Sequence, residues 1–137
     1  MKPDDLKNRT KQFALRVLKL VAALPNNLSG KTIGGQLVRS GTSVGANYRA
    51  ACRARSKAEF IAKIGIVEEE ADESAFWMEL IIDGKLLVAP QVQPLLNEAN
   101  EIAKIMASSR KSASESLKPK ANGKLAIGNL KSAMTYG

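Results

Sequence analysis

The chain has 137 residues, 45% of them hydrophobic and 25% charged, with a formal net charge of +8, so one domain with a hydrophobic core can form. It contains no histidine and one cysteine, Cys52, which excludes histidine-based catalysis, Cys/His zinc sites and an intrachain disulfide. No apolar run approaches the roughly 20 residues of a membrane helix, and the N-terminus lacks a signal-peptide core, so we expect a cytoplasmic protein and no membrane partner.

The positive charge is unevenly distributed along the sequence. Residues 1–60 contain twelve Lys and Arg against three Asp and Glu, residues 61–107 three against nine, and residues 108–137 six against one. A basic excess with an isoelectric point near 9.8 favours a nucleic-acid partner. A solvated basic surface without a specific partner would give the same composition.

The first predicted element is an amphipathic helix over about residues 5–24. Its apolar residues recur at helical spacing and form one stripe: Leu6, Phe13, Val17, Leu20, Val21 and Leu24. The turn residues PNNLSG at 25–30 end this helix.

Residues 28–32, LSGKT, are similar to the end of a phosphate-binding loop, whose full pattern is G-x-x-x-x-G-K-[ST] after a strand. Pro25 stands where the first glycine is required, and the preceding stretch is helical. We therefore interpret the segment as a turn that leads into the next helix, and we expect no bound nucleotide or other cofactor.

The second predicted helix covers about residues 32–54. Four polar residues spaced 4, 3 and 4 apart form a strip beside its apolar face: Gln36, Ser40, Ser43 and Asn47. Gly34, Gly41 and Gly45 flank the other edge of that face. Because glycine weakens a helix, three of them on one edge predict that another backbone comes close there.

The third predicted helix begins after Ser56 and runs to about residue 82. The segment SKAE at 56–59 is typical of a capping box, in which Ser56 and Glu59 bond each other's backbone amides. Beyond the core stripe, Ile66, Trp77 and Leu80 form a second apolar side. A helix with two apolar sides packs against more than one neighbour, so we expect these three residues at a contact with another subunit.

The carboxylate cluster EEEADE at 68–73 lies within this helix. Di-metal bundles combine such residues with Glu-x-x-His motifs, and without histidine we expect no metal. Counting outward from the turn near 55–56 brings Arg39 level with about Asp72, so Glu70 or Glu73 can pair with Arg39 or bond the polar strip. The predicted structural polar network comprises Gln36, Arg39, Ser40, Ser43, Asn47, Glu70 and Glu73.

A fourth helix is predicted over about residues 92–110, after a break rich in glycine and proline at 83–94. Residues 1–112 therefore form a helical bundle domain. From 113 the sequence becomes polar and basic with proline and glycine, which predicts a mobile tail over 113–137.

Basic residues concentrate at the end of the second helix and the following turn, and the first helix contributes more. The predicted patch comprises Lys11, Arg16, Lys19, Arg49, Arg53, Arg55 and Lys57. Arginine suits phosphate because its planar fork donates two parallel hydrogen bonds. Only six aromatic residues occur, so contact with the phosphate backbone is expected rather than stacking on bases. A solvated face that repels unwanted partners is the alternative.

Residues 34–81 resemble the bacterial four helix bundle protein family, also called the 23S rRNA-intervening sequence protein family. The resemblance rests on QLVRSGTSVGANYRAA, RSKAEF, EEEADE and the aromatic pair Phe76–Trp77. It implies an all-α, up-down antiparallel four-helix bundle that assembles as a homopentameric ring. It also implies a relative, the accessory variability determinant of diversity-generating retroelements, which is a basic pentamer that binds nucleic acid and a reverse transcriptase. The resemblance supplies no catalytic residue.

Together these observations favour a non-enzymatic, homo-oligomeric basic bundle that binds RNA or DNA mainly through phosphate contacts. The alternative is a protein-binding scaffold or adaptor with no nucleic-acid partner.

Overall fold

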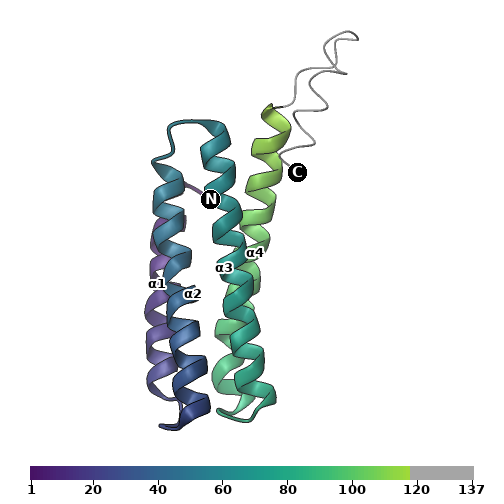
Figure 1. The fold of residues 1–137 in the computed structure, drawn as a ribbon. Helices are drawn as coiled ribbons and strands as arrows, with labels where there is room; N and C mark the ends of the chain where they lie inside the picture. The colour runs from purple at the N-terminus through teal and green to yellow at the C-terminus, as the bar shows by residue number, and fades with distance from the viewer. Residues whose placement is uncertain (118–137) are drawn as a thin grey trace.

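The structure is a computed structural model that describes residues 1–117 as four α-helices. They are α1 (Pro3–Ala22), α2 (Leu28–Cys52), α3 (Lys57–Asp83) and α4 (Ala89–Leu117), with no strand among the described residues. Short connections reverse the chain between consecutive helices, so neighbouring helices run antiparallel (Figure 1). The predicted all-α architecture is confirmed.

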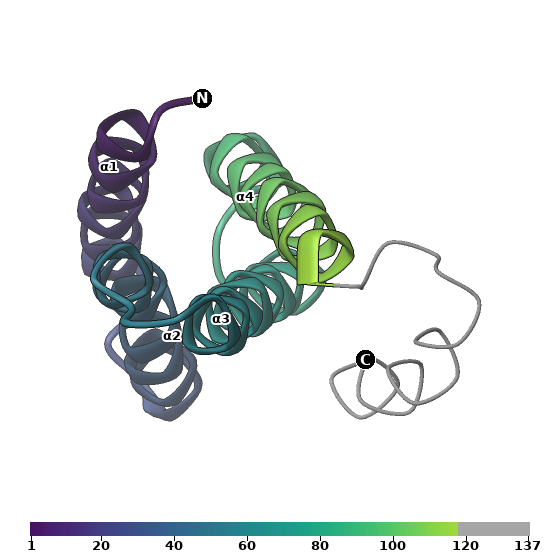
Figure 2. The ribbon, with the colours of Figure 1, turned by 90° about the horizontal axis from the view of Figure 1, so that it is seen from above.

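The helices pack in sequence order around one core. α1 packs on α2, α2 on α3, and α3 on α4, whereas the contact that closes the bundle between α1 and α4 is much smaller. Seen along the helices, α1 and α4 diverge from each other across the open side of the bundle (Figure 2). The α1–α4 seam is therefore the least packed of the four.

The core is formed by the apolar stripes of all four helices. Phe13 of α1, Leu37 of α2, Ile64 and Met78 of α3, and Ile102 of α4 are each at most 1% exposed. Burying such a side chain stabilises the fold by about 1.5–3 kcal/mol. The helical spacing of these residues is what selects the face that each helix turns inward.

Two helix starts depend on capping side chains. α2 begins four residues before the predicted start because the Asn27 side chain accepts a hydrogen bond of 2.9 Å from the Gly30 amide. The segment LSGKT is thus the first turn and a half of α2, preceded by a helix and a turn. Ser56 caps α3 by accepting from the Glu59 amide at 3.1 Å, while the Glu59 carboxylate accepts from the amide of Arg55 rather than that of Ser56.

The limits of α4 differ from the predicted range of 92–110. The helix begins at Ala89, and Pro94 in its second turn removes one backbone hydrogen bond without ending it. At the other end α4 continues to Leu117, so residues 113–117 belong to the helix rather than to the predicted tail. The remainder of that tail, residues 118–137, lies outside the described residues.

Candidate functional site

The glycine edge of α2 lies against α1. A Cβ atom placed on Gly41 would lie 2.8 Å from Cγ2 of Val17, and one on Gly34 would lie 3.0 Å from Cγ1 of Val21. Gly45 faces the backbone of Thr10. The close approach expected from these glycines is present, and the neighbour is α1.

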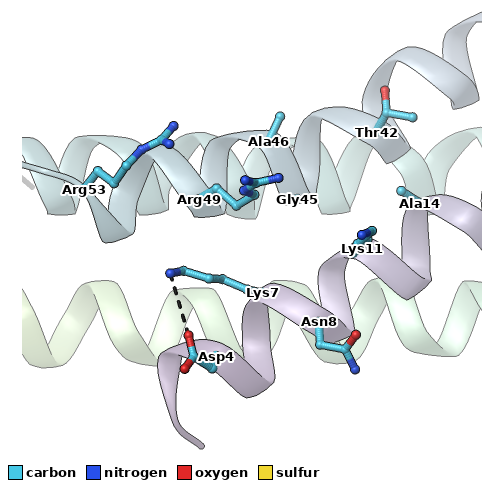
Figure 3. A pocket seen from close by; sticks show the side chains of 10 residues that line it. All are labelled: Asp4, Lys7, Asn8, Lys11, Ala14, Thr42, Gly45, Ala46, Arg49 and Arg53. Atoms are coloured by element: carbon cyan, nitrogen blue, oxygen red, sulfur yellow. Dashed lines mark ion pairs between the residues drawn. The ribbon is translucent and has the colours of Figure 1, made fainter.

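Towards the N-terminal end of α1, the same two helices border a groove of about 590 Å³ (Figure 3). Its lining combines small residues with long polar ones. The lining residues are Asp4, Lys7, Asn8, Lys11 and Ala14 of α1, and Thr42, Gly45, Ala46, Arg49 and Arg53 of α2. None of these ten residues is aromatic.

Four cations and one carboxylate line this groove, which we call the α1/α2 groove. Lys7 extends into the space between the helices, with Arg49 and Arg53 on the opposite wall (Figure 3). The Lys7 ammonium lies 3.8 Å from the carboxylate of Asp4. Among the described residues, no carboxylate lies within ion-pair distance of Lys11, Arg49 or Arg53. The groove therefore carries a net positive charge that its own side chains leave largely uncompensated.

The groove contains part of the predicted basic patch. Lys11, Arg49 and Arg53 meet at the groove, where they are joined by Lys7, which the prediction omitted although it lies one turn before Lys11.

The other four members of the predicted patch do not line the groove. Arg16 lies near Glu98 of α4, where its charge helps to lower the pKa of that carboxyl after the larger effect of the Arg9 hydrogen bond. Lys57 donates a hydrogen bond to the Ser116 hydroxyl, also on α4. Lys19 and Arg55 are exposed, on the later part of α1 and in the α2–α3 turn.

Arg39 is the centre of the polar contacts between α2 and α3. Its Nη1 donates to Glu70 Oε2 at 3.1 Å, its Nη2 pairs with the Glu73 carboxylate, and its Nε donates to Gln36 Oε1 at 3.3 Å. The register counted from the α2–α3 turn predicted one of these two carboxylates, and the structure places both on the same guanidinium. Half of the Arg39 side chain is exposed, so these contacts specify register more than they add stability.

The other polar residues of the predicted network bond within α2 or in the buried core between α2 and α3. Asn47 donates its amide to both the carbonyl and the hydroxyl of Ser43 on its own helix, at 2.9 and 2.8 Å. The fully buried Ser40 hydroxyl lies 2.9 Å from that of Ser74 on α3. Ser74 is the polar residue among the buried side chains of α3, and a serine at helical spacing among apolar residues is the sequence signal for this pairing.

The outward face of α3 exposes an apolar stripe. Ile66 is 38% exposed and Phe76 49%, while Trp77 and Leu80 are half-buried. Phe76 and Trp77 contact each other edge to face with ring centroids 5.2 Å apart, and the Trp77 indole donates to Glu73. The prediction named three of these residues and omitted Phe76.

Groups with catalytic or metal-binding chemistry do not converge elsewhere in residues 1–117. Burial, followed by a hydrogen bond with Cys52, raises the pKa of the Tyr48 phenol, which keeps this core side chain protonated. Within this range no cluster of three or more Cys, Asp or Glu side chains is arranged to hold a metal ion. None of the described helices combines the length and apolarity that crossing a membrane requires.

A family model described as 23S rRNA-intervening sequence protein matches residues 4–108, about three quarters of the chain. The chain belongs to this family. The matched range reaches from the first turn of α1 into the second half of α4 and includes every residue that lines the α1/α2 groove. The family resemblance noted in the sequence is confirmed.

One solved relative shares both sequence and fold with this family member. A protein of unknown function from the S23 ribosomal protein family of Bacteroides thetaiotaomicron VPI-5482 is 37% identical, with a TM-score of 0.75. The alignment covers 81% of this chain and 99% of that one. No curated protein sequence matches the chain. Membership therefore establishes the fold, and a function has to be argued from the surfaces of the bundle.

Proposed function

We propose that the protein is a non-enzymatic, homo-oligomeric helical bundle that binds RNA or DNA mainly through phosphate contacts. The observation that carries this proposal is the α1/α2 groove, which is lined by Lys7, Lys11, Arg49 and Arg53, with Asp4 as the only carboxylate among the described lining residues. A concave surface lined by charges of one sign concentrates counter-ions of the opposite sign. Phosphate is the anion that these side chains suit, because arginine binds it with two parallel hydrogen bonds and lysine as a point charge.

Base-specific recognition has little support in the groove. Its polar lining offers Asn8 and Thr42 beside the four cations. The Thr42 hydroxyl already donates to the backbone carbonyl of Val38. Contacts between the four cations and phosphates position a nucleic acid by its backbone and carry no sequence information.

Self-assembly is the second part of the proposal, and the outward face of α3 supports it. Ile66 and Phe76 are exposed there beside the half-buried Trp77 and Leu80, on a helix whose other side is already in the core. A second copy of the chain would bury this stripe. The family resemblance favours a pentamer, in which five copies at +8 each carry a formal charge of +40.

A complementary surface for the stripe is present on α1. Leu15 and Leu18 are 49% and 44% exposed on its outward side, with the exposed Lys19 one turn after Leu15. The α3 stripe instead has exposed carboxylates beside it, including Glu69. Two different surfaces that match in apolarity and oppose in charge favour a head-to-tail contact, which generates a ring when its rotation closes.

Fluorescence anisotropy with unrelated labelled RNA and DNA over a range of salt concentrations tests the binding. We expect weak to moderate affinity with little sequence preference, and a log–log salt slope that grows by about 0.9 for each phosphate neutralised on duplex DNA. Replacing Arg49 and Arg53 by glutamate should flatten that slope and weaken binding to all sequences alike. A loss confined to one sequence would mean that these arginines read bases.

Sedimentation velocity tests the assembly. Leu80→Glu or Trp77→Ala should shift the parent oligomer towards smaller species while circular dichroism stays helical, because both side chains are only half-buried within one copy of the chain. A well-folded monomer of the parent protein at micromolar concentration would contradict the proposal.

A protein-binding scaffold is the second candidate, favoured by the same α3 stripe if another protein covers it. The two functions separate at low ionic strength, where phosphate contacts are strong. If the parent protein binds no nucleic acid at about 50 mM salt, the scaffold function replaces the first proposal.

A further inference from the structure

The four cations of the α1/α2 groove form two facing rows. Lys7 and Lys11 lie one helical turn apart on α1, and Arg49 and Arg53 lie one turn apart on α2. Residues at this spacing have Cβ atoms about 5–6 Å apart on the same face of a helix. Because α1 and α2 are antiparallel and close together at Gly41 and Gly45, the two rows lie on opposite walls of the α1/α2 groove.

Part of the groove lining is made of small residues. Ala14, Gly45 and Ala46 line it between the charged residues and leave room there. A rigid, repetitive polyanion can lie along such a surface with its phosphates at both rows. This arrangement does not enclose a single small anion, which would need donors that converge on one point.

Aromatic side chains are absent from the groove, and those of the described residues lie elsewhere. Phe13 and Tyr48 are buried in the core, at 1% and 5% exposure, and the partly buried Phe60 of α3 packs against it. Phe76 is exposed and Trp77 half-buried on α3, which lacks the extensive contacts with α1 that α2 makes. Proteins that bind single strands combine a basic channel with aromatic platforms on which the bases stack. The groove offers a basic channel without aromatic platforms.

We propose that the α1/α2 groove is specific for the backbone of a double-stranded nucleic acid, RNA or DNA, over a single strand. The inference rests on the proposed function and names the form of nucleic acid that this groove takes. A duplex keeps its bases paired and stacked, so it needs no platform from the protein. It also carries one charge per 1.7 Å of axis, about twice the density of one strand, on a backbone that is already ordered.

The test compares one short duplex of mixed sequence with each of its separated strands, as RNA and as DNA, by anisotropy over a range of salt. The duplex should bind at least about tenfold more tightly than either strand, with a salt slope of about 0.9 per neutralised phosphate against about 0.7 for the strands. Comparing the affinities of the RNA duplex and the DNA duplex shows which of the two nucleic acids the groove prefers.

Charge-reversal pairs localise the binding. Lys11→Glu with Arg53→Glu reverses one cation on each wall of the groove, whereas Lys31→Glu with Lys104→Glu makes the same change in net charge at exposed positions outside it. The groove pair should lose at least about tenfold in duplex affinity and lower the salt slope by about two, and the control pair should lose much less. Circular dichroism and thermal melting confirm that each variant folds.

Two results would overturn the inference: strands that bind as tightly as the duplex, or a control pair that weakens binding as much as the groove pair. Failure of the proposed function looks different, because the parent protein would then bind neither duplex nor strand at low salt.

Discussion

Arg9 of α1 and Glu98 of α4 form a two-point ion pair across the least packed seam of the bundle. Arg9 Nε donates to Glu98 Oε2 at 2.8 Å, and Arg9 Nη2 donates to Oε1 at 2.7 Å. The side chains are only 28% and 18% exposed. Since few other contacts join α1 to α4, this pair is the main polar link that closes the bundle.

The first prediction concerns the pH dependence of this link. The hydrogen bond from Arg9 lowers the pKa of Glu98 below its usual value. A carboxyl with a lowered folded pKa contributes stability that is present above its unfolded pKa, near 4.3, and is lost as the pH falls through the folded pKa. Glu98→Gln should therefore reduce the free energy of unfolding by about 1–2 kcal/mol at pH 7, and by progressively less below about pH 4.

Urea denaturation of the parent and Glu98→Gln at several pH values measures the difference. Glu79→Gln, at an exposed position on α3, is the control and should stay within about 0.5 kcal/mol of the parent throughout. An effect of Glu98→Gln that is the same at pH 7 and pH 3 would contradict the ionic origin of the link.

The second prediction separates two glycines of α2. A Cβ on Gly41 would lie within 3 Å of both methyl groups of Val17, whose β-branched side chain cannot easily turn away. Gly41→Ala should cost about 1–2 kcal/mol through overpacking, although alanine favours the helix. Gly35, by contrast, has open space where its Cβ would lie, so Gly35→Ala should stabilise by about 0.5–1 kcal/mol. If Gly41→Ala has a higher melting temperature than Gly35→Ala, α1 does not pack closely against Gly41 of α2.

Helical periodicity located all four helices and their inward faces because burial repeats with the period of the helix. The ends were less predictable. α2 begins earlier because Asn27 caps it, and α4 extends to Leu117 through a polar segment whose composition resembles a tail. Pro94 indicated a break, yet so near the start of a helix it removes a single hydrogen bond.

The candidate site was only partly predictable for a geometric reason. Arg49 and Arg53 share a face of one helix, so their proximity follows from spacing alone. Arg55 and Lys57 are close to them in sequence, but the α2–α3 turn directs Lys57 towards Ser116 of α4. Lys7 could have been added from its spacing to Lys11, whereas the position of Arg16 near Glu98 depends on where α4 packs, which periodicity does not show.

The third prediction concerns the turn after α3. Lys85 adopts the left-handed conformation with φ of 58°, and Gly84 before it has no room for a side chain because a Cβ would lie 2.8 Å from the Leu80 carbonyl oxygen. Lys85→Gly should therefore stabilise by about 0.5–1 kcal/mol, and Gly84→Ala should destabilise. Urea denaturation measures both changes. A Lys85→Gly variant less stable than the parent would mean that the lysine side chain contributes more than the backbone strain costs.

The last prediction concerns Asp4, the one carboxylate of the α1/α2 groove. It pairs with Lys7 at 3.8 Å, and with 95% of its side chain exposed it competes with a phosphate for that ammonium. Such an exposed pair contributes up to about 1 kcal/mol, so Asp4→Asn should raise affinity for duplex nucleic acid by about two- to fivefold at low salt. The gain should shrink as salt screens the groove. Asp5→Asn makes the same change in net charge one residue away, outside the groove lining, and should raise affinity less. Equal gains from both variants in anisotropy titrations would show that the total charge of the protein, and not the occupancy of Lys7, controls binding.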